Sequence, residues 1–211
     1  MKNLRVLVRE RLLREAAVSA SRAAAQGYAL VRDETGTKYC LIDPDYLDSE
    51  IALISEDDPQ VLTRVPKLAH ALAMTTVIVG YLWLTGTSDP SVMQVDVVAA
   101  KSGYGPLMYD IAMSHRFITS AVNGDTSPDA EGVWKRYYKR DDVARVEFPQ
   151  KRAVKPWLAQ AYRLQTPVDV GSLTDNYDLI QNQLAHVVVP HVLTRAVLMA
   201  GSSWAMGEIN G

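Results

Sequence analysis

Residues 92–113 join a β-branched segment, a turn with two glycines and a helical segment without any linker between them. Gly103 and Gly105 permit positive φ angles and close approach of a ligand to the backbone. Pro106 suits the first turn of a helix, because an N–H group at this position would have no acceptor within the helix. The free N–H groups and the dipole of such a helix N-terminus favour an anion, most often a phosphate. The segment therefore predicts a strand, a tight turn and a helix that can hold an anionic ligand.

The rest of the chain alternates between short β-type and helical runs. Two hairpins are expected, at residues 28–42 and 76–98, because polar turn residues separate paired β-branched runs. Further elements are expected as helices at 4–25, 59–74, 107–113, 128–140 and 174–199 and as strands at 118–122 and 143–148, with residues 149–172 ambiguous. This order predicts an α/β or α+β fold with one mixed, mostly antiparallel sheet flanked by helices.

A chain of 211 residues with 48% hydrophobic and 22% charged residues fits one globular domain with appendages. We divide it into an N-terminal amphipathic helix (1–27), a central domain (28–148) and a helical C-terminal extension (149–211) packed on the same domain. The N-terminal helix either packs on the domain or docks on a protein partner. The C-terminal extension also offers apolar surface that another chain could cover.

Charge and composition argue against several classes of protein. A net charge of −2 does not suggest nucleic-acid binding. No run reaches the ~18 apolar residues of a membrane span, and the charged N-terminus does not resemble a signal peptide. The single Cys40 is compatible with a reducing compartment, so a cytoplasmic location is expected. The four histidines show no metal-ligand spacing, and no metal is expected.

Two common phosphate-binding motifs do not fit the glycine turn. A dinucleotide-binding fingerprint needs a third glycine where Met108 stands, and the Gly-Lys-Ser/Thr sequence of a P-loop is absent. A plain connection between strand and helix remains an alternative for this turn.

The order of elements in residues 28–148 resembles the GNAT-type N-acyltransferase family. In that family a Gln/Arg-x-x-Gly-x-Gly/Ala turn after the fourth strand holds the pyrophosphate of acetyl-CoA. The matching stretch here begins at Ala100 and has both glycines, whereas Ala100 replaces the leading Gln or Arg and Lys101 could contribute charge. The amino-acid sequence of residues 103–110 and 127–138 is also similar to that of acetyltransferase-like proteins of bacteriophages.

The resemblance implies acetyl-CoA as co-substrate, with its pyrophosphate on the turn and its pantetheine arm along residues 92–98. The implied contacts are Val97, Val98, Ala99, Lys101, Ser102, Gly103, Tyr104, Gly105 and Pro106. Backbone N–H groups near 97–99 would polarise the thioester carbonyl. Separation of the strands at 76–84 and 92–98 beside Asp96 would open the cleft for CoA.

Acyl transfer to an amine requires a base, because a lysine-like amine has a pKa near ~10.4, and an acid for the leaving thiolate, whose pKa is about 8.5. Asp96 interrupts an apolar strand, where desolvation would raise its pKa toward that of a base. Strand alternation places Asp96 with Gln94 and Val98, opposite Val95 and Val97. A structural carboxylate is the alternative. For the acid, the family pattern indicates Tyr138, ahead of its neighbour Tyr137.

The sequence thus predicts an acyl-CoA-dependent N-acyltransferase acting on a small-molecule or protein amine. The alternative is a catalytically inactive, acyltransferase-like structural or interaction protein, for example a phage component, whose location would be the host cytoplasm. A nucleotide-binding regulatory domain that uses the same turn is a third hypothesis. Stabilisation by acetyl-CoA distinguishes the first hypothesis from the second.

Overall fold

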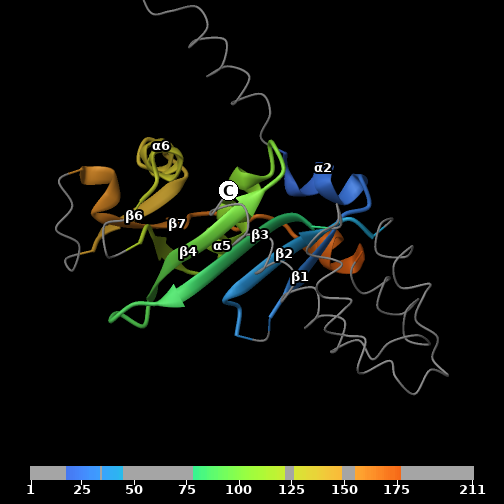
Figure 1. Ribbon diagram of the computed structural model, residues 1–211, viewed down its shortest axis with the longest axis horizontal. Coiled ribbons are helices and arrows are strands. Elements are labelled where there is room, and N and C mark those ends of the chain that lie inside the picture. The colour runs from blue at the N-terminus through green and yellow to red at the C-terminus, as the bar shows by residue number, and fades with distance from the viewer. Residues whose placement is uncertain (1–17, 34, 45–77, 122–125, 149–154, 177–211) are drawn as a thin grey trace, which may run out of the picture.

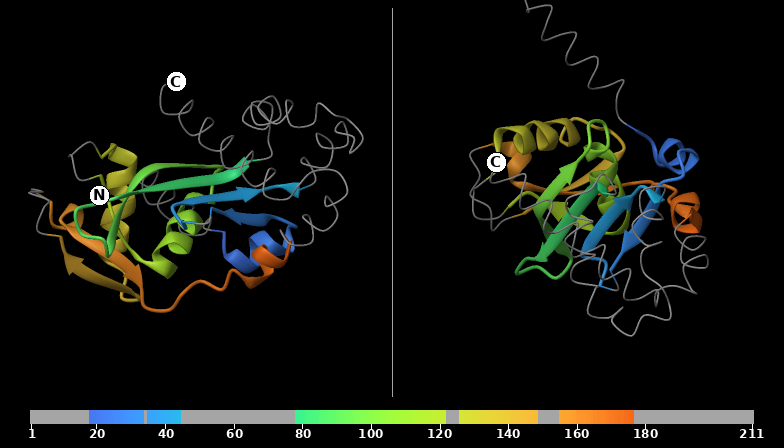
Figure 2. Two further views of the ribbon diagram at one scale, coloured as in Figure 1. Left: turned by 90° about the horizontal axis from the view of Figure 1, so that it is seen from below. Right: turned by 45° about the vertical axis from the view of Figure 1, so that its right-hand side comes forward.

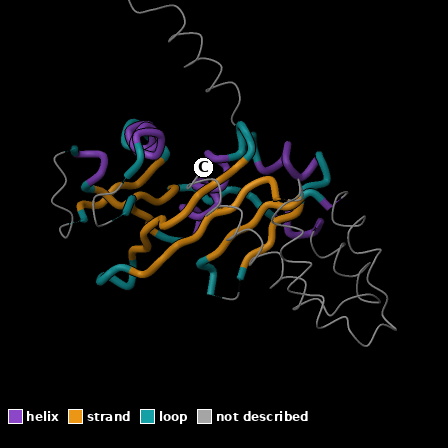
Figure 3. Tube along the Cα trace, in the orientation of Figure 1, coloured by secondary structure: helices purple, strands orange, loops and turns teal. Residues whose placement is uncertain are grey.

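A computed structural model describes residues 18–33, 35–44, 78–121, 126–148 and 155–176 of the chain (Figure 1). These residues form a seven-stranded sheet with helices beside it (Figure 3). The strands are β1 (Ala29–Arg32), β2 (Lys38–Ile42), β3 (Ile78–Gly86), β4 (Val92–Ala100), β5 (Phe117–Thr119), β6 (Val143–Glu147) and β7 (Gln160–Leu164). The helices are α2 (Ala20–Ala25), α5 (Gly105–His115), α6 (Pro128–Tyr137), the 3-10 helix η1 (Pro156–Leu158) and a helical stretch at 171–176.

The strands follow the order β1-β2-β3-β4-β5-β7-β6 across the sheet. All neighbouring strands are antiparallel except β4 and β5, which are parallel. The predicted mixed, mostly antiparallel sheet is therefore confirmed, as are the hairpins β1–β2 and β3–β4. The parallel pair requires a crossover, and α5 supplies it.

A bulge interrupts β4. Trp83 pairs with Val97 and Leu84 pairs with Val95, so Asp96 has no partner on β3. The extra residue reverses the alternation of side chains, and Val95 and Val98 both pack toward the main core. The predicted placement of Val95 on the face opposite Val98 is therefore wrong. A bulge depends on the pairing of two strands, so the alternation within one strand could not reveal it.

The main core lies between the sheet and helices on one face. Figure 2 shows α2, α5 and the stretch at 171–176 on this face. Met108 of α5 is fully buried, and a Cβ at Gly80 would lie 2.8 Å from its sulfur. Glycine on β3 thus allows α5 to lie directly against the sheet. This contact fixes α5, and with it the glycine turn, relative to β4.

The N-terminal helix differs from the prediction. Ser19 is extended (φ −79°, ψ 158°), and its hydroxyl accepts a hydrogen bond from the Arg22 N–H, so α2 begins at Ala20. One continuous helix over 4–25 is therefore wrong, although the predicted stop at Gly27 (φ +82°) is confirmed. The part of that helix before residue 18, with its hypothetical docking role, lies outside the described residues.

The C-terminal half contains a strand that the sequence prediction left ambiguous. β7 pairs with β5 and β6, so the sheet extends into the segment assigned to a helical extension. Pro156 and η1 directly before β7 obscured its short pattern. The expected helix at 174 begins at 171, and α6 ends at Tyr137 rather than 140. The helix at 59–74 and residues 177–211 lie outside the described residues.

Candidate functional site

β4 and β5 pair over only three residues and then separate. Val92, Met93 and Gln94 pair with Phe117–Thr119, and beyond Gln94 no described strand pairs with this side of β4. The opening contains a cavity of about 230 Å³. Its wall includes Val95, Asp96 and Val98 of β4, Tyr109 of α5, Ser120 and Ala121 after β5, and Thr126, Ser127, Ala130 and Trp134 at α6.

The backbone of β4 directs polar groups into this opening. The Lys101 N–H donates to the Val79 carbonyl, and antiparallel pairing alternates from there. The N–H and C=O groups of Val98 and Ala100 consequently point away from β3, toward the unpaired side. An extended ligand with amide groups could pair there as an additional strand would.

The glycine turn lies at the same end of β4. The Tyr104 N–H donates to the Lys101 carbonyl, and Gly103 has a φ of +89°, as the third position of a type II turn requires. Tyr104 precedes α5 without a side-chain cap. Within the described residues, no acceptor is found for the N–H groups of Ser102, Gly103, Gly105 and Leu107. These donors and the dipole of α5 are suited to an anion.

The segment around α2 holds the turn without using those donors. The Val18 N–H donates to the Gly103 carbonyl over 3.1 Å. The Tyr104 hydroxyl donates to Gln26 Oε1 over 2.7 Å, and its ring lies 5.6 Å from that of Tyr28. Both contacts engage groups other than the turn amides. The turn is therefore positioned rigidly while its N–H groups stay available within the described part of the chain.

Asp96 lies at the bulge and borders the cavity, but its environment differs from the prediction. The side chain is exposed, whereas the sequence suggested a desolvated carboxylate. β3 and β4 stay paired on both sides of Asp96, so the cleft that a separation of these two strands would open for CoA is not found there. The opening lies on the other side of β4, toward β5, because β5 leaves the sheet after Thr119.

The structure places the two tyrosine candidates away from the cavity wall. Tyr138 caps the C-terminus of α6, half-buried, with the Arg145 guanidinium 5.3 Å from its ring centre. Tyr137 is buried, and its hydroxyl donates to Asp110 Oδ1 over 2.9 Å and lies 3.2 Å from the Pro106 carbonyl oxygen. Neither is among the residues that line the cavity beside Asp96.

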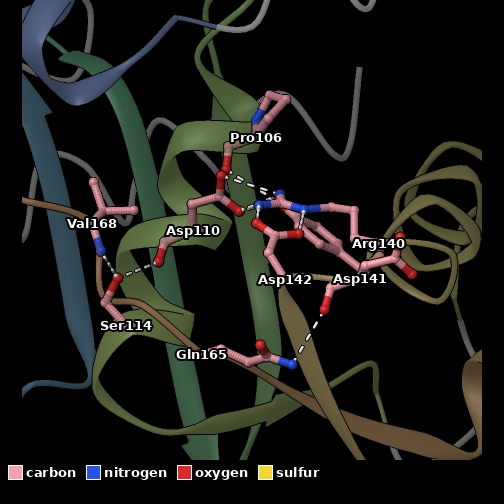
Figure 4. A network of polar contacts seen from close by, with 9 residues as sticks. Pro106, Asp110, Ser114, Arg140, Asp141, Asp142, Gln165 and Val168 are labelled. Atoms are coloured by element: carbon pink, nitrogen blue, oxygen red, sulfur yellow. Dashed lines mark hydrogen bonds and ion pairs between the residues drawn. The ribbon is translucent and has the colours of Figure 1, made fainter.

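A polar network of Asp110, Arg140 and Asp142 joins α5 to the residues after α6 (Figure 4), and the Tyr137 hydroxyl is part of it. Arg140 donates to Asp110 over 2.9 Å and to both carboxylate oxygens of Asp142. Burial raises the pKa of Asp110, and the charge of Arg140 opposes this effect. Hydrogen bonding to Arg140 lowers the pKa of Asp142. The network holds the first two turns of α5, and with them the N–H donors of the glycine turn.

Tyr109 is the phenol that borders the cavity, and the sequence prediction did not single it out. Its ring lies edge-on to Trp134 at 5.4 Å, and burial raises the pKa of its hydroxyl. Thr126 is another missed residue: its buried hydroxyl oxygen has no hydrogen-bond partner within the described residues. Tyr109 lies within residues 103–110, which the sequence analysis compared with phage proteins, but only the packing of α5 shows which way its side chain faces.

The comparisons leave the relationship to known proteins open. No family model matches this chain, and searches of curated proteins and of solved structures find no match. Among the described residues, no group of His, Cys, Asp or Glu side chains is arranged to hold a metal ion. No helix in the described part of the chain is long and apolar enough to cross a membrane.

Proposed function

We propose that this protein is an acyl-CoA-dependent N-acyltransferase of GNAT type that transfers an acetyl group to an amine. One observation carries the proposal: the opening between β4 and β5 and the uncapped N-terminus of α5 lie at the same end of β4. An acyl-CoA has matching parts, because its diphosphate is anionic and its pantetheine arm is an extended chain with amide groups.

The diphosphate would bind the N–H groups of Ser102, Gly103, Gly105 and Leu107, with Lys101 nearby. The pantetheine arm would lie along β4 and pair with the backbone of Val98 and Ala100. The thioester would then reach the cavity beside Asp96. The strand order, with its single parallel pair, supports the family resemblance, whereas Ala100 in place of Gln or Arg weakens it.

The reaction is a direct attack of a neutral amine on the thioester carbonyl. The amine nitrogen forms the new bond, the carbon–sulfur bond breaks, and the thiolate leaves with a proton from an acid. Asp96 would take the ammonium proton, directly or through water. Tyr138 remains the acid suggested by the resemblance, and Tyr109 is the second candidate, since it borders the cavity and burial keeps it protonated.

The test is thermal unfolding with and without acetyl-CoA, followed by turnover assays against a panel of amines. At 100 times its dissociation constant the ligand should add about 2.7 kcal/mol of stability. Asp96→Asn should lower turnover at least tenfold with the stabilisation unchanged, and Asp141→Asn, an exposed matched control, should alter neither. Tyr109→Phe and Tyr138→Phe then identify the acid. An absent shift at millimolar acetyl-CoA refutes the proposal.

The second candidate function is an inactive scaffold with the same fold, binding protein partners through its N- and C-terminal segments. Two observations favour it: Asp96 is exposed, and Tyr138 lies off the cavity wall. In this case acetyl-CoA produces no stabilisation. Under either function we propose a cytoplasmic protein, and if a phage encodes it, as the resemblance implies, the cytoplasm is that of the host cell.

A further inference from the structure

Three arginines and a histidine gather at the opposite end of α5 from the proposed CoA site. We call Arg32, His115, Arg116 and Arg163 the cation cluster; they come from β1, the end of α5 and β7. Arg32 pairs with Tyr39 across β1 and β2, and the His115 ring stacks on Tyr39 at 6.4 Å and 6°. A Cβ added to Gly36 would lie 3.0 Å from Arg116 Nη2 and 3.8 Å from the Tyr39 hydroxyl.

Two buried polar atoms in this region have no partner within the described residues. They are the hydroxyl of Tyr39, a residue that is fully buried, and Nε of Arg116. Buried polar groups are nearly always hydrogen-bonded, and an unsatisfied one often marks a bound ion or water. Both atoms lie beside the β1–β2 turn, so one small ligand could serve both.

Asp33, a carboxylate beside the β1–β2 turn, is held by that turn rather than by the arginines. Asp33 accepts hydrogen bonds from the N–H groups of Thr37 (2.7 Å) and Lys38 (2.8 Å), and from the hydroxyls of Thr35 and Thr37. Its oxygens are therefore occupied within the turn. In the described part of the chain, Arg32, Arg116 and Arg163 form no ion pair with a carboxylate.

The dipole of α5 explains only part of this arrangement. A helix C-terminus favours cations, which accounts for His115 and Arg116 at the end of α5. It accounts neither for Arg32 and Arg163, which come from strands, nor for the unsatisfied hydroxyl of Tyr39. The pKa of His115 is lowered by burial and then by the charges of Arg32, Arg116 and Arg163, so all three guanidinium groups act on this imidazole.

We propose that the cation cluster and the Tyr39 hydroxyl form a binding site for a phosphate group, either inorganic phosphate or a phosphate monoester. The hydroxyl of Tyr39 and Nε of Arg116 donate to its inner oxygens. Arg32 and His115, which are exposed and adjoin Tyr39, lie on its outer side, and Arg163 of β7 adds positive charge. The site is separate from the turn that would hold CoA, because the eleven residues of α5 span roughly 16 Å.

The test measures thermal stability in sodium phosphate against sodium chloride of equal ionic strength, with glycerol phosphate as the monoester. Phosphate should stabilise the protein specifically, and Arg116→Gln should weaken its apparent affinity at least tenfold. Arg145→Gln, which removes the same charge from β6, should leave the affinity unchanged. Tighter binding of glycerol phosphate than of phosphate identifies a monoester as the ligand.

Two further measurements keep the test decisive if Arg116→Gln does not fold. Tyr39→Phe should weaken phosphate binding without destabilising the free protein, because the lost hydroxyl has no partner within the described residues. Bound phosphate should raise the pKa of His115, which NMR can follow. The groups that face this imidazole are Tyr39 and Asp33 and the opposing charges of Arg32, Arg116 and Arg163. Stabilisation no greater than in chloride, or an unchanged His115, overturns the proposal, whatever acetyl-CoA does.

Discussion

At the scale of single residues, Gly80 shows how the absence of a side chain on a strand sets the position of a helix. The backbone of β3 leaves no room for a Cβ beside Met108, which is fully buried in the main core. Met108 also stands where a dinucleotide-binding fingerprint would have its third glycine. The small residue of this contact is thus on the strand, and the large one is on the helix.

We expect Gly80→Ala to lower the free energy of unfolding by about 1–3 kcal/mol, since the new methyl group forces Met108 or α5 to move. Urea denaturation measures the change. Gly132→Ala is the matched control, because this exposed position in α6 has nothing within 4 Å of the new Cβ. The control should gain up to about 1 kcal/mol from helix propensity. Equal behaviour of the two variants would contradict this explanation.

The lowered pKa of His115 predicts a dependence of stability on pH. The unfolded chain takes up a proton near pH ~6.5, before the folded protein does, so stability is lost as the pH falls through and below this value. His115→Gln should show a smaller loss between pH 7.5 and 5.5 in chloride buffer, measured by chemical denaturation. An identical profile for both proteins would show that the arginines do not affect His115.

At the scale of elements, the contact between α5 and α6 determines where the turn donors lie. The Tyr137 hydroxyl contacts the Pro106 carbonyl and Asp110, and Arg140 completes the connection to Asp142. The hydrogen bonds join the end of α6 and the residues after it to the first two turns of α5. Tyr137 is therefore a positioning residue. The predicted acid was its neighbour, Tyr138.

Tyr137→Phe should lower the free energy of unfolding by about 1–2 kcal/mol, because Asp110 loses a donor in a half-buried network. Tyr138→Phe is the control, since no hydrogen bond of its hydroxyl is found within the described residues, and it should change stability by less than about 0.5 kcal/mol. Urea denaturation compares them. If the two variants are equally stable, the network does not hold α6 against α5.

At the scale of the whole molecule, α5 separates two proposed anion sites, one at each end. The N-terminal site depends on uncapped N–H groups, and the C-terminal site depends on guanidinium groups from three elements. Sites that share no residue and lie roughly 16 Å apart should bind independently.

We therefore expect the stabilisation by acetyl-CoA and by phosphate to add to within about 0.5 kcal/mol. Thermal unfolding with each ligand alone and with both ligands measures this. Arg116→Gln should abolish the phosphate increment and preserve that of acetyl-CoA. Loss of the phosphate increment once acetyl-CoA is saturating would mean that one ligand occupies both sites.

Local sequence determined the features that depend on neighbours along the chain. The β-branched runs with polar turns gave both hairpins, and Gly27 ended α2. The Ser127 cap with Pro128 started α6. Each feature follows from the conformational preference or hydrogen bonding of a few consecutive residues. The glycine turn before α5 belongs to the same group, because positive φ at Gly103 is a local requirement.

Only the tertiary structure decided features that depend on distant pairs of residues. The bulge at Asp96 comes from the register of β3 on β4, and the opening beside it comes from the departure of β5. β7 was hidden because its pairing with β5 and β6, rather than its own short pattern, defines it. Packing also directs Tyr109 toward the cavity and places Arg116 beside Gly36. Contacts between distant residues decide such features because they outweigh the weak conformational preferences of isolated segments.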